Sequence, residues 1–232
     1  MSNAILVIGE SGTGKTTSIE TLPPQETLIF LVEKEDLPFR GWKKNFIPLS
    51  KDGGNLVRCK SSTPGKVVDT IIATLEHIDK NRKDIKYIII DDFIYTMVNE
   101  FMDRAKEKSF DKFTDIAVKA HQLVNKAKAL REDLNVAILT HSEEYMDASG
   151  IRKQKIKTLG KLLDNSVNLE GMFNTVLYTN VESSPEGNKY TFLTQNQHNT
   201  GKTPKGMFKD LRIPNDLKLV FDTIESYKND YR

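Results

Sequence analysis

The chain has 232 residues, and its 34 lysines and arginines nearly balance its 32 aspartates and glutamates, which gives a formal net charge of +2. Bulk charge therefore does not indicate nucleic acid or a membrane as a partner, and any basic site must be local. The single Cys59 excludes an internal disulfide and zinc-type cysteine pairs. No apolar stretch approaches the roughly 20 residues that a membrane-spanning helix needs. We expect one domain over residues 1–232, soluble in a reducing, cytoplasmic setting.

The first informative stretch is residues 4–17, AILVIGESGTGKTT. Its apolar start predicts a strand, which leads into a turn that matches G-x-x-x-x-G-K-[ST] in full. Gly12 and Gly14 permit backbone conformations closed to larger residues, so that consecutive N–H groups can surround a phosphate. Lys15 then reaches the β- and γ-phosphates, and the Thr16 hydroxyl can ligate Mg²⁺. The predicted triphosphate-binding residues are Gly9, Glu10, Ser11, Gly12, Thr13, Gly14, Lys15, Thr16 and Thr17.

The phosphate motif is followed by a short predicted helix over residues 17–22, which Pro23 ends. Residues 27–32 form a continuous apolar run that predicts a buried strand. In an open parallel sheet, ligands bind at the carboxyl ends of the strands. Glu33 and Glu35, just beyond this strand, are therefore candidates for orienting the attacking water, and the alternative is a solvated polar turn.

An irregular segment over residues 37–55 contains Trp42, which we expect to be a packing anchor. A short strand is predicted at residues 56–60. The sequence Ser62-Thr63-Pro64 is typical of a helix start, with a capping hydroxyl followed by proline. Apolar residues at helical spacing from Val67 to Ile78 mark the buried face of this helix.

Residues 85–92, IKYIIIDD, form the second informative stretch. An apolar strand that ends in aspartate is weak evidence by itself, but downstream of a phosphate loop it predicts the acidic magnesium motif of P-loop proteins. Asp91 is expected to hold Mg²⁺ directly or through water, and Asp92 can activate the attacking water.

Two helices are predicted at residues 93–109 and 112–132, the second with a clear amphipathic stripe. Residues 135–139 then predict a buried strand that ends in Thr140 and His141. Polar side chains at this strand end can sense the γ-phosphate, and the alternative for His141 is a simple cap of the strand.

Residues 142–157 are expected to form a loop at the same edge of the sheet. The basic part of this region suits a phosphate backbone, whose binding lysine and arginine dominate; the alternative is a solvated basic loop. Farther along, residues 174–181 and 189–194 predict a β-hairpin, and residues 215–227 predict the last helix. The candidate nucleic-acid residues are Arg152, Lys153, Lys155, Lys157 and Lys161.

The motifs in this order resemble the RecA-like recombinase core, and more closely the phage-encoded ATP-binding proteins of the AAA/RecA-core type. The resemblance covers nearly the whole chain. Its motifs are GESGTGKTT (9–17), LPFRGWKKN (37–45), YIIIDDF (87–93), ILTHSEE (138–144), IKTLGKLLD (156–164), LEGMFNTVLYTN (169–180) and TGKTPKGMF (200–208). It implies an α/β P-loop fold, in which a mostly parallel sheet is flanked by helices and ends in an antiparallel hairpin.

The resemblance also implies ATP as the nucleotide, with sites between the subunits of a homo-oligomer and with the loop after the sensing strand on single-stranded DNA. Lys202 or Lys205 is then expected to reach a neighbour's γ-phosphate, much as an arginine finger does. Departures are the short first helix, the glutamate after the second strand, which Glu33 and Glu35 match equally, and the lack of additional pairing and oligomerisation domains. An accessory or annealing-linked ATPase is therefore expected rather than a strand-exchange enzyme.

The sequence thus predicts a Mg²⁺-dependent ATPase coupled to single-stranded DNA in phage recombination or replication, with other phage proteins as further partners and no membrane. Two other classes stay open. A nucleotide or small-molecule kinase also uses a phosphate loop, although such kinases usually deploy several lid arginines and this chain has few. A nucleotide-gated assembly module would bind ATP and scarcely hydrolyse it.

Overall fold

The computed structural model of the protein describes residues 1–51, 53–59, 65–159 and 167–230. These residues form a nine-stranded sheet in the order β3-β2-β4-β5-β1-β7-β8-β9, with β6 paired only to β5. The strands are β1 (Asn3–Gly9), β2 (Thr27–Leu31), β3 (Leu56–Arg58), β4 (Tyr87–Asp91), β5 (Asn135–Met146), β6 (Arg152–Ile156), β7 (Thr175–Ser184), β8 (Gly187–Leu193) and β9 (Arg212–Pro214).

The first six strands of this order, from β3 to β7, pair in parallel. Strands β7, β8 and β9 complete the sheet in antiparallel pairs. The predicted fold class, a mostly parallel α/β sheet with a C-terminal antiparallel hairpin, is confirmed. Because parallel strands share one direction, the phosphate loop after β1, Asp91 at the end of β4 and the polar residues of β5 meet at one edge.

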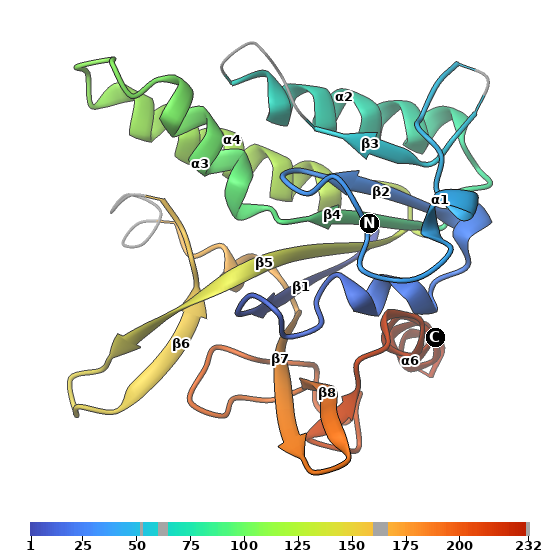
Figure 1. The fold of residues 1–232 in the computed structure, drawn as a ribbon, viewed down its shortest axis with the longest axis vertical. Helices are drawn as coiled ribbons and strands as arrows, with labels where there is room; N and C mark the ends of the chain where they lie inside the picture. The colour runs from blue at the N-terminus through green and yellow to red at the C-terminus, as the bar shows by residue number, and fades with distance from the viewer. Residues whose placement is uncertain (52, 60–64, 160–166, 231–232) are drawn as a thin grey trace.

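Helices cover both faces of the sheet (Figure 1). The helices are α1 (Trp42–Asn45), α2 (Lys66–Asn81), α3 (Ile94–Asp103), α4 (Asp111–Lys128) and α6 (Leu217–Asn229), with the 3₁₀ turns η1 (Thr17–Thr21), η2 (Pro24–Glu26) and η3 (Glu170–Met172). Alternate residues of each strand enter separate cores, because successive side chains point to opposite faces. In β1, Leu6 packs in the core under α2, α3 and α4, whereas Val7 packs in the core with η1, α1 and α6.

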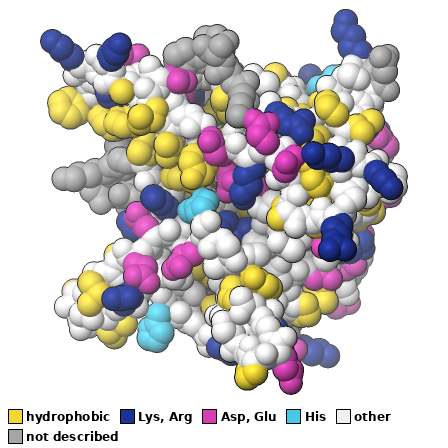
Figure 2. Space-filling view, in the orientation of Figure 1, with side chains coloured by type: hydrophobic (Ala, Val, Ile, Leu, Met, Phe, Trp, Pro, Cys, Tyr) yellow, Lys and Arg dark blue, Asp and Glu magenta, His cyan; other side chains and the backbone are white. Residues whose placement is uncertain are grey.

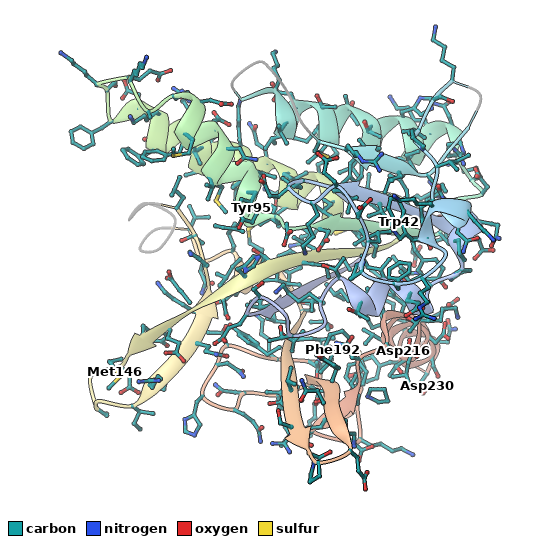
Figure 3. The ribbon with its side chains drawn as sticks, viewed as in Figure 1. Trp42, Tyr95, Met146, Phe192, Asp216 and Asp230 are labelled. Carbon is teal, nitrogen blue, oxygen red and sulfur yellow. The ribbon has the colours of Figure 1, made fainter. Side chains whose placement is uncertain are left out.

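The largest departure from expectation lies after residue 141. The predicted loop over residues 142–157 is wrong: β5 continues to Met146 and pairs antiparallel with β6. This β5–β6 arm projects beyond the sheet, with Met146 near its tip (Figures 1 and 3). Charged residues are accommodated because they face opposite charges across the pair, as Lys155 faces Glu143 with Nζ and Oε1 3.1 Å apart.

Smaller differences concern element ends. The helix after the phosphate loop is the five-residue 3₁₀ turn η1, and β9 was not predicted. Trp42 is 8% exposed in the core with α1, which confirms its packing role (Figure 3). The predicted helix start at residues 62–64 lies outside the described residues, and α2 begins at Lys66. Within the described ranges, none of the helices is both long enough and apolar enough to cross a bilayer.

Candidate nucleotide site

The phosphate loop leaves β1 at Gly9 and turns back through two glycines with positive φ, Gly12 at 78° and Gly14 at 93°. This left-handed region is open to glycine and strained for other residues, as the sequence predicts. Gly9 has another reason to be glycine, because a Cβ there would lie 1.7 Å from Thr179 Oγ1 of β7. Thr179 Oγ1 also lies 2.6 Å from Thr13 Oγ1, so the loop is held against β7.

Lys15 lies inside this loop. Its ammonium group donates to the carbonyl oxygens of Gly9 at 2.8 Å and Glu10 at 2.7 Å, and the residue is 5% exposed. Burial lowers the pKa of Lys15 to about 8. The loop thus holds a buried cation beside the backbone turn, which is the arrangement expected for a β- and γ-phosphate ligand.

Thr16 and Asp91 are joined across 75 residues of sequence. The Thr16 hydroxyl lies 3.1 Å from Asp91 Oδ1 and 3.0 Å from Oδ2, where it donates to the carboxylate. Asp91 is fully buried, and burial raises its pKa to about 6 against the opposing charge of Lys34. A hydroxyl and a carboxylate are hard oxygen ligands, which fit Mg²⁺.

The ligand set for Mg²⁺ is nevertheless small. In the described ranges, no three His, Cys, Asp or Glu side chains converge where they could hold a metal. Magnesium is typically held by one or two protein groups together with substrate phosphates and water, so Thr16 and Asp91 are sufficient protein ligands. The ion would supply charge neutralisation at the phosphate oxygens.

Asp92 follows β4 with a φ of 64°, a left-handed conformation that is uncommon outside glycine, asparagine and aspartate. This turn brings its carboxylate to His141, whose Nε2 lies 3.2 Å from Asp92 Oδ1. Burial opposes the charged form of Asp92, but the His141 hydrogen bond and the charge of Lys34 lower its pKa. Asp92 is 2% exposed and ionised, as a group that orients water requires.

The two residues predicted to sense the γ-phosphate, Thr140 and His141, point to different surroundings. His141 packs edge-on against Tyr95, with ring centroids 6.0 Å apart, and contacts Asp92. Thr140 is fully buried, and its Oγ1 has no hydrogen-bond partner among the described residues. Of these two residues, only His141 is joined to Asp92 by a hydrogen bond.

Lys34, which the sequence did not single out, lies at the centre of the site. Its Nζ donates to Thr16 Oγ1 at 2.8 Å and lies 3.1 Å from Asp92 Oδ2 and 3.6 Å from Asp91 Oδ2. Partial burial disfavours the charge, yet the two aspartates raise the pKa of Lys34 above its ordinary value. The only sequence signal was its position shortly after the carboxyl end of β2 at Leu31.

The two glutamates that flank Lys34 have partners outside this group. Glu33 accepts a hydrogen bond from Asn99 of α3 at 3.0 Å, and Glu35 forms an ion pair with Arg58 of β3 at 3.5 Å. The structure does not bring Glu33 or Glu35 together with Thr16 and Asp91. Their predicted role in orienting water stays a prediction.

The basic residues lie along the β5–β6 arm, beside acids. Arg152 pairs with Glu144 and Lys153 pairs with Asp147. Figure 2 shows side chains of both charges mixed over the arm and the centre of this face, without one continuous basic surface. Lys155 pairs as described above, Lys157 is exposed, and Lys161 lies outside the described residues.

Lys202 and Lys205 lie away from the phosphate loop of their own chain. The backbone of Lys202 pairs with Val176, which stands beside Leu6 in the middle of β1. The Lys205 carbonyl accepts a hydrogen bond from Tyr227 near the end of α6. The structure thus does not bring either lysine to the nucleotide site within one chain, and their action on a neighbour stays a prediction.

Two further residues beside the loop were missed. A Cβ built on Gly14 would lie 3.0 Å from the ring of Tyr190 on β8 and 3.3 Å from the Asn215 amide. Tyr190 is 40% exposed, and the buried Asn215 Nδ2 has no hydrogen-bond partner in the described part of the chain. Both come from C-terminal segments that turn propensities alone do not place next to residue 14.

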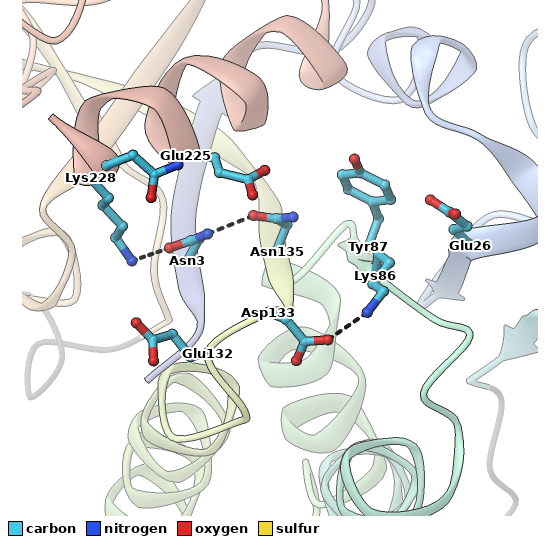
Figure 4. Close-up of a pocket in the computed structure, with 10 residues that line it drawn as sticks. Asn3, Glu26, Lys86, Tyr87, Glu132, Asp133, Asn135, Glu225 and Lys228 are labelled. Atoms are coloured by element: carbon cyan, nitrogen blue, oxygen red, sulfur yellow. Dashed lines mark hydrogen bonds and ion pairs between the residues drawn. The ribbon is translucent and has the colours of Figure 1, made fainter. Parts of the chain in front are cut away.

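Two cavities border the sheet at opposite ends. One of about 970 Å³ is lined by Glu10 and Thr13 of the phosphate loop, by Gln154 of the arm and by Asn180 of β7. Another of about 540 Å³ lies at the amino ends of the strands and is lined by Asn3 and by polar and charged residues (Figure 4). The second is remote from the phosphate loop and contributes nothing to the nucleotide site.

A family match agrees with this geometry. A family model described as an AAA domain matches residues 1–203, so the chain belongs to this family of P-loop proteins, for which ATP binding is implied. In its sheet, β5 lies between the phosphate-loop strand β1 and the Asp91 strand β4. A solved structure of a KaiC-like protein from the hyperthermophilic archaeon Pyrococcus horikoshii OT3 is similar at 14% identity and a TM-score of 0.42, over 82% of this chain and 77% of that chain. No curated protein matches.

Proposed function

We propose that the protein is a Mg²⁺-dependent ATPase. The observation that carries this proposal is the convergence of Lys15, Thr16, Asp91 and Asp92 at one sheet edge, with Thr16 about 3 Å from the Asp91 carboxylate. A phosphate loop, two oxygen ligands and a further ionised carboxylate are the parts that phosphoryl transfer to water requires.

Each residue has a role in this proposal. Lys15 leaves the carbonyls of Gly9 and Glu10 for the β- and γ-phosphates, and Thr16 with Asp91 holds the magnesium ion. Asp92 accepts a hydrogen bond from the attacking water. His141 donates to Asp92 and fixes the direction of its carboxylate. Positioning and charge stabilisation supply nearly all of the catalysis in such reactions.

The nucleoside end of ATP is proposed to lie on the side of Tyr190 and Asn215. The magnesium ligands lie towards β4, on one side of the loop, whereas these two residues approach Gly14 from β8 and the α6 side. A half-exposed tyrosine ring offers a stacking surface, and aromatic stacking on a base contributes about 1–3 kcal/mol. The unpartnered Asn215 amide adds a hydrogen-bond donor.

We further propose that hydrolysis is coupled to single-stranded DNA through the β5–β6 arm in phage recombination or replication, in a homo-oligomer in which Lys202 or Lys205 reaches a neighbour's γ-phosphate. Support comes from the hydrogen bond between Gln154 of the arm and Glu10 of the phosphate loop, 3.1 Å long. The partly exposed Tyr145 near the arm tip offers a stacking ring for a base.

The test is phosphate release from ATP, with Mg²⁺ or with EDTA, and with or without oligothymidine, by wild type and Lys15→Ala. Lys44→Ala, an exposed lysine on α1, is the matched control. Mg²⁺-dependent release that only Lys15→Ala abolishes supports the ATPase. Phosphate that appears on an added nucleoside favours a kinase, and tight ATP binding without release favours an assembly module.

The DNA part has its own readout. Affinity for oligothymidine should fall as salt rises, because phosphate contacts release counterions. Turnover that ignores oligothymidine, together with no salt-dependent binding, overturns the coupling and leaves the ATPase standing. Particle size with and without ATP tests the homo-oligomer, and a size that ignores ATP counts against the intersubunit lysine.

A further inference from the structure

The segment after β2 presents one side chain to the nucleotide site. Glu33 turns to Asn99 on α3 and Glu35 turns to Arg58 on β3, so the two acids are held on neighbouring elements. Lys34, between them, extends to Thr16, Asp91 and Asp92. The two flanking contacts hold the residues on either side of Lys34 away from the site, and only the Lys34 side chain of the three is joined to Thr16, Asp91 and Asp92.

The atoms that Lys34 contacts are those that the magnesium ion needs. Thr16 Oγ1 accepts from Lys34 and donates to Asp91, so the Lys34 ammonium competes with a cation for this oxygen. Two positive charges within a few ångströms also repel each other in a buried setting. Binding of the ion at Thr16 and Asp91 therefore requires Lys34 to move.

The side chain of Lys34 is able to move. It is 42% exposed, whereas those of Asp91 and Asp92 are 1% and 3% exposed. A lysine carries a compact charge on a flexible four-carbon stem, so its head can shift while its backbone stays fixed. A phosphate held in the loop beside Thr16 would offer a new anionic partner to an ammonium group released from Thr16.

We propose that Lys34 is a second phosphate-directed lysine, which exchanges the metal ligands for the γ-phosphate when Mg²⁺ and ATP bind. This rests on the proposed function and deepens it, because Lys34 then distinguishes a triphosphate from a diphosphate within one chain. The role is one of charge, so arginine can replace the lysine and an uncharged side chain of similar length cannot.

Equilibrium binding of ATP and ADP in Mg²⁺ buffer, measured by titration calorimetry, tests the proposal. Lys34→Met should weaken ATP binding about 10- to 100-fold and ADP binding less than about threefold, as expected for loss of one charge-assisted contact to the γ-phosphate. Lys34→Arg should restore most of the ATP preference. Lys43→Met is the matched control, because Lys43 is an exposed lysine in the same connection between β2 and β3.

A second measurement needs no nucleotide. Mn²⁺ binding to the protein alone, followed by electron paramagnetic resonance, should be about tenfold tighter in Lys34→Met than in wild type, because the competing ammonium is gone. Lys43→Met should match wild type. Thermal unfolding of each variant identifies any loss of structure, and Lys34→Arg provides a folded, charged comparison.

The outcomes distinguish the role of Lys34 from the proposed ATPase function on which it rests. If wild type binds neither nucleotide, or if Lys15→Ala binds both as wild type does, the proposed function fails. If wild type binds ATP and Lys34→Met keeps the same ratio of ATP to ADP affinity, the proposed function stands and the role of Lys34 is overturned. Unchanged Mn²⁺ affinity in Lys34→Met overturns the exchange at the metal ligands.

Discussion

Replacement of Gly9 by alanine should destabilise the protein for a steric reason. The new Cβ would lie 1.7 Å from Thr179 Oγ1, 2.9 Å from Thr13 Oγ1 and 3.0 Å from Thr179 Cβ, so that the Thr179 side chain or strand β7 must shift. Forced overpacking of this kind typically costs about 1–3 kcal/mol. For a chain of this length, each kcal/mol lowers Tm by about 2–4 °C, so Gly9→Ala should melt about 2–12 °C below wild type.

Thr179→Ala is the partner in a double-mutant cycle. It removes the oxygen that clashes and, in the wild-type background, costs about 1 kcal/mol through the lost contact with Thr13. Urea unfolding of the four proteins gives the loss in free energy of unfolding for each variant. The loss in the double variant should be smaller than the sum of the two single losses by more than about 0.5 kcal/mol, the usual limit of additivity for independent sites. Additive effects would refute the clash.

Gly12→Ala tests the cost of backbone strain in the absence of a steric clash. Gly12 has a φ of +78°, and its added Cβ would meet nothing within 4 Å. Its cost should be the strain of a left-handed alanine, about 1–2 kcal/mol, and no change at Thr179 should relieve it. Equal rescue of both glycine variants by Thr179→Ala would contradict this distinction.

Three further predictions follow from the same contacts. Burial raises the pKa of the Cys59 thiol to about 12 from an ordinary 9.0, so native protein should resist iodoacetamide at pH 8 and react fully only in urea. The thiol's contribution to stability is present below pH 9 and falls as pH rises from 9 towards 12. Urea unfolding at several pH values checks this dependence. Tyr190→Ala should weaken ATP binding about 5- to 150-fold, corresponding to about 1–3 kcal/mol of stacking, whereas Tyr190→Phe should bind nearly as wild type in the same calorimetric titration. Asp92→Asn should lower kcat about 100-fold or more with little change in ATP affinity, since it removes a group that acts on water; His141→Ala should lower kcat less, and a turnover equal to wild type in both would remove the pair from the mechanism.

Local patterns were sufficient to predict the phosphate loop and its magnesium partner. The glycine spacing of residues 9–16 dictates the turn, and an apolar strand ending at Asp91 belongs at the same sheet edge. Thr16 and Asp91 could thus be paired although the sequence between them is long. The direction of the Thr16 hydroxyl and the turn of Asp92 with positive φ required the structure, because they accompany contacts with residues distant in sequence, Asp91 for Thr16 and His141 for Asp92.

Lys34 could not be predicted because four charged residues in a row, at positions 33–36, give no information on which one points inward. The choice is fixed by Asn99 and Arg58, which lie on elements far along the chain. Similarly, residues 143–155 lack the apolar alternation that marks a strand. Their pairing is stabilised by charges facing each other across β5 and β6, a non-local feature that appears only when both strands are in register.

Strand β5 carries His141 beside Asp92 and continues without interruption to Met146 in the arm. At about 3.3 Å per residue, the five steps between them span roughly 17 Å. A fluorophore attached at a cysteine in place of Met146 would therefore be joined to the nucleotide site through a single strand. Energy transfer from a fluorescent nucleotide in the phosphate loop to this dye would report nucleotide occupancy, and a change in its efficiency at full occupancy would report movement of the arm.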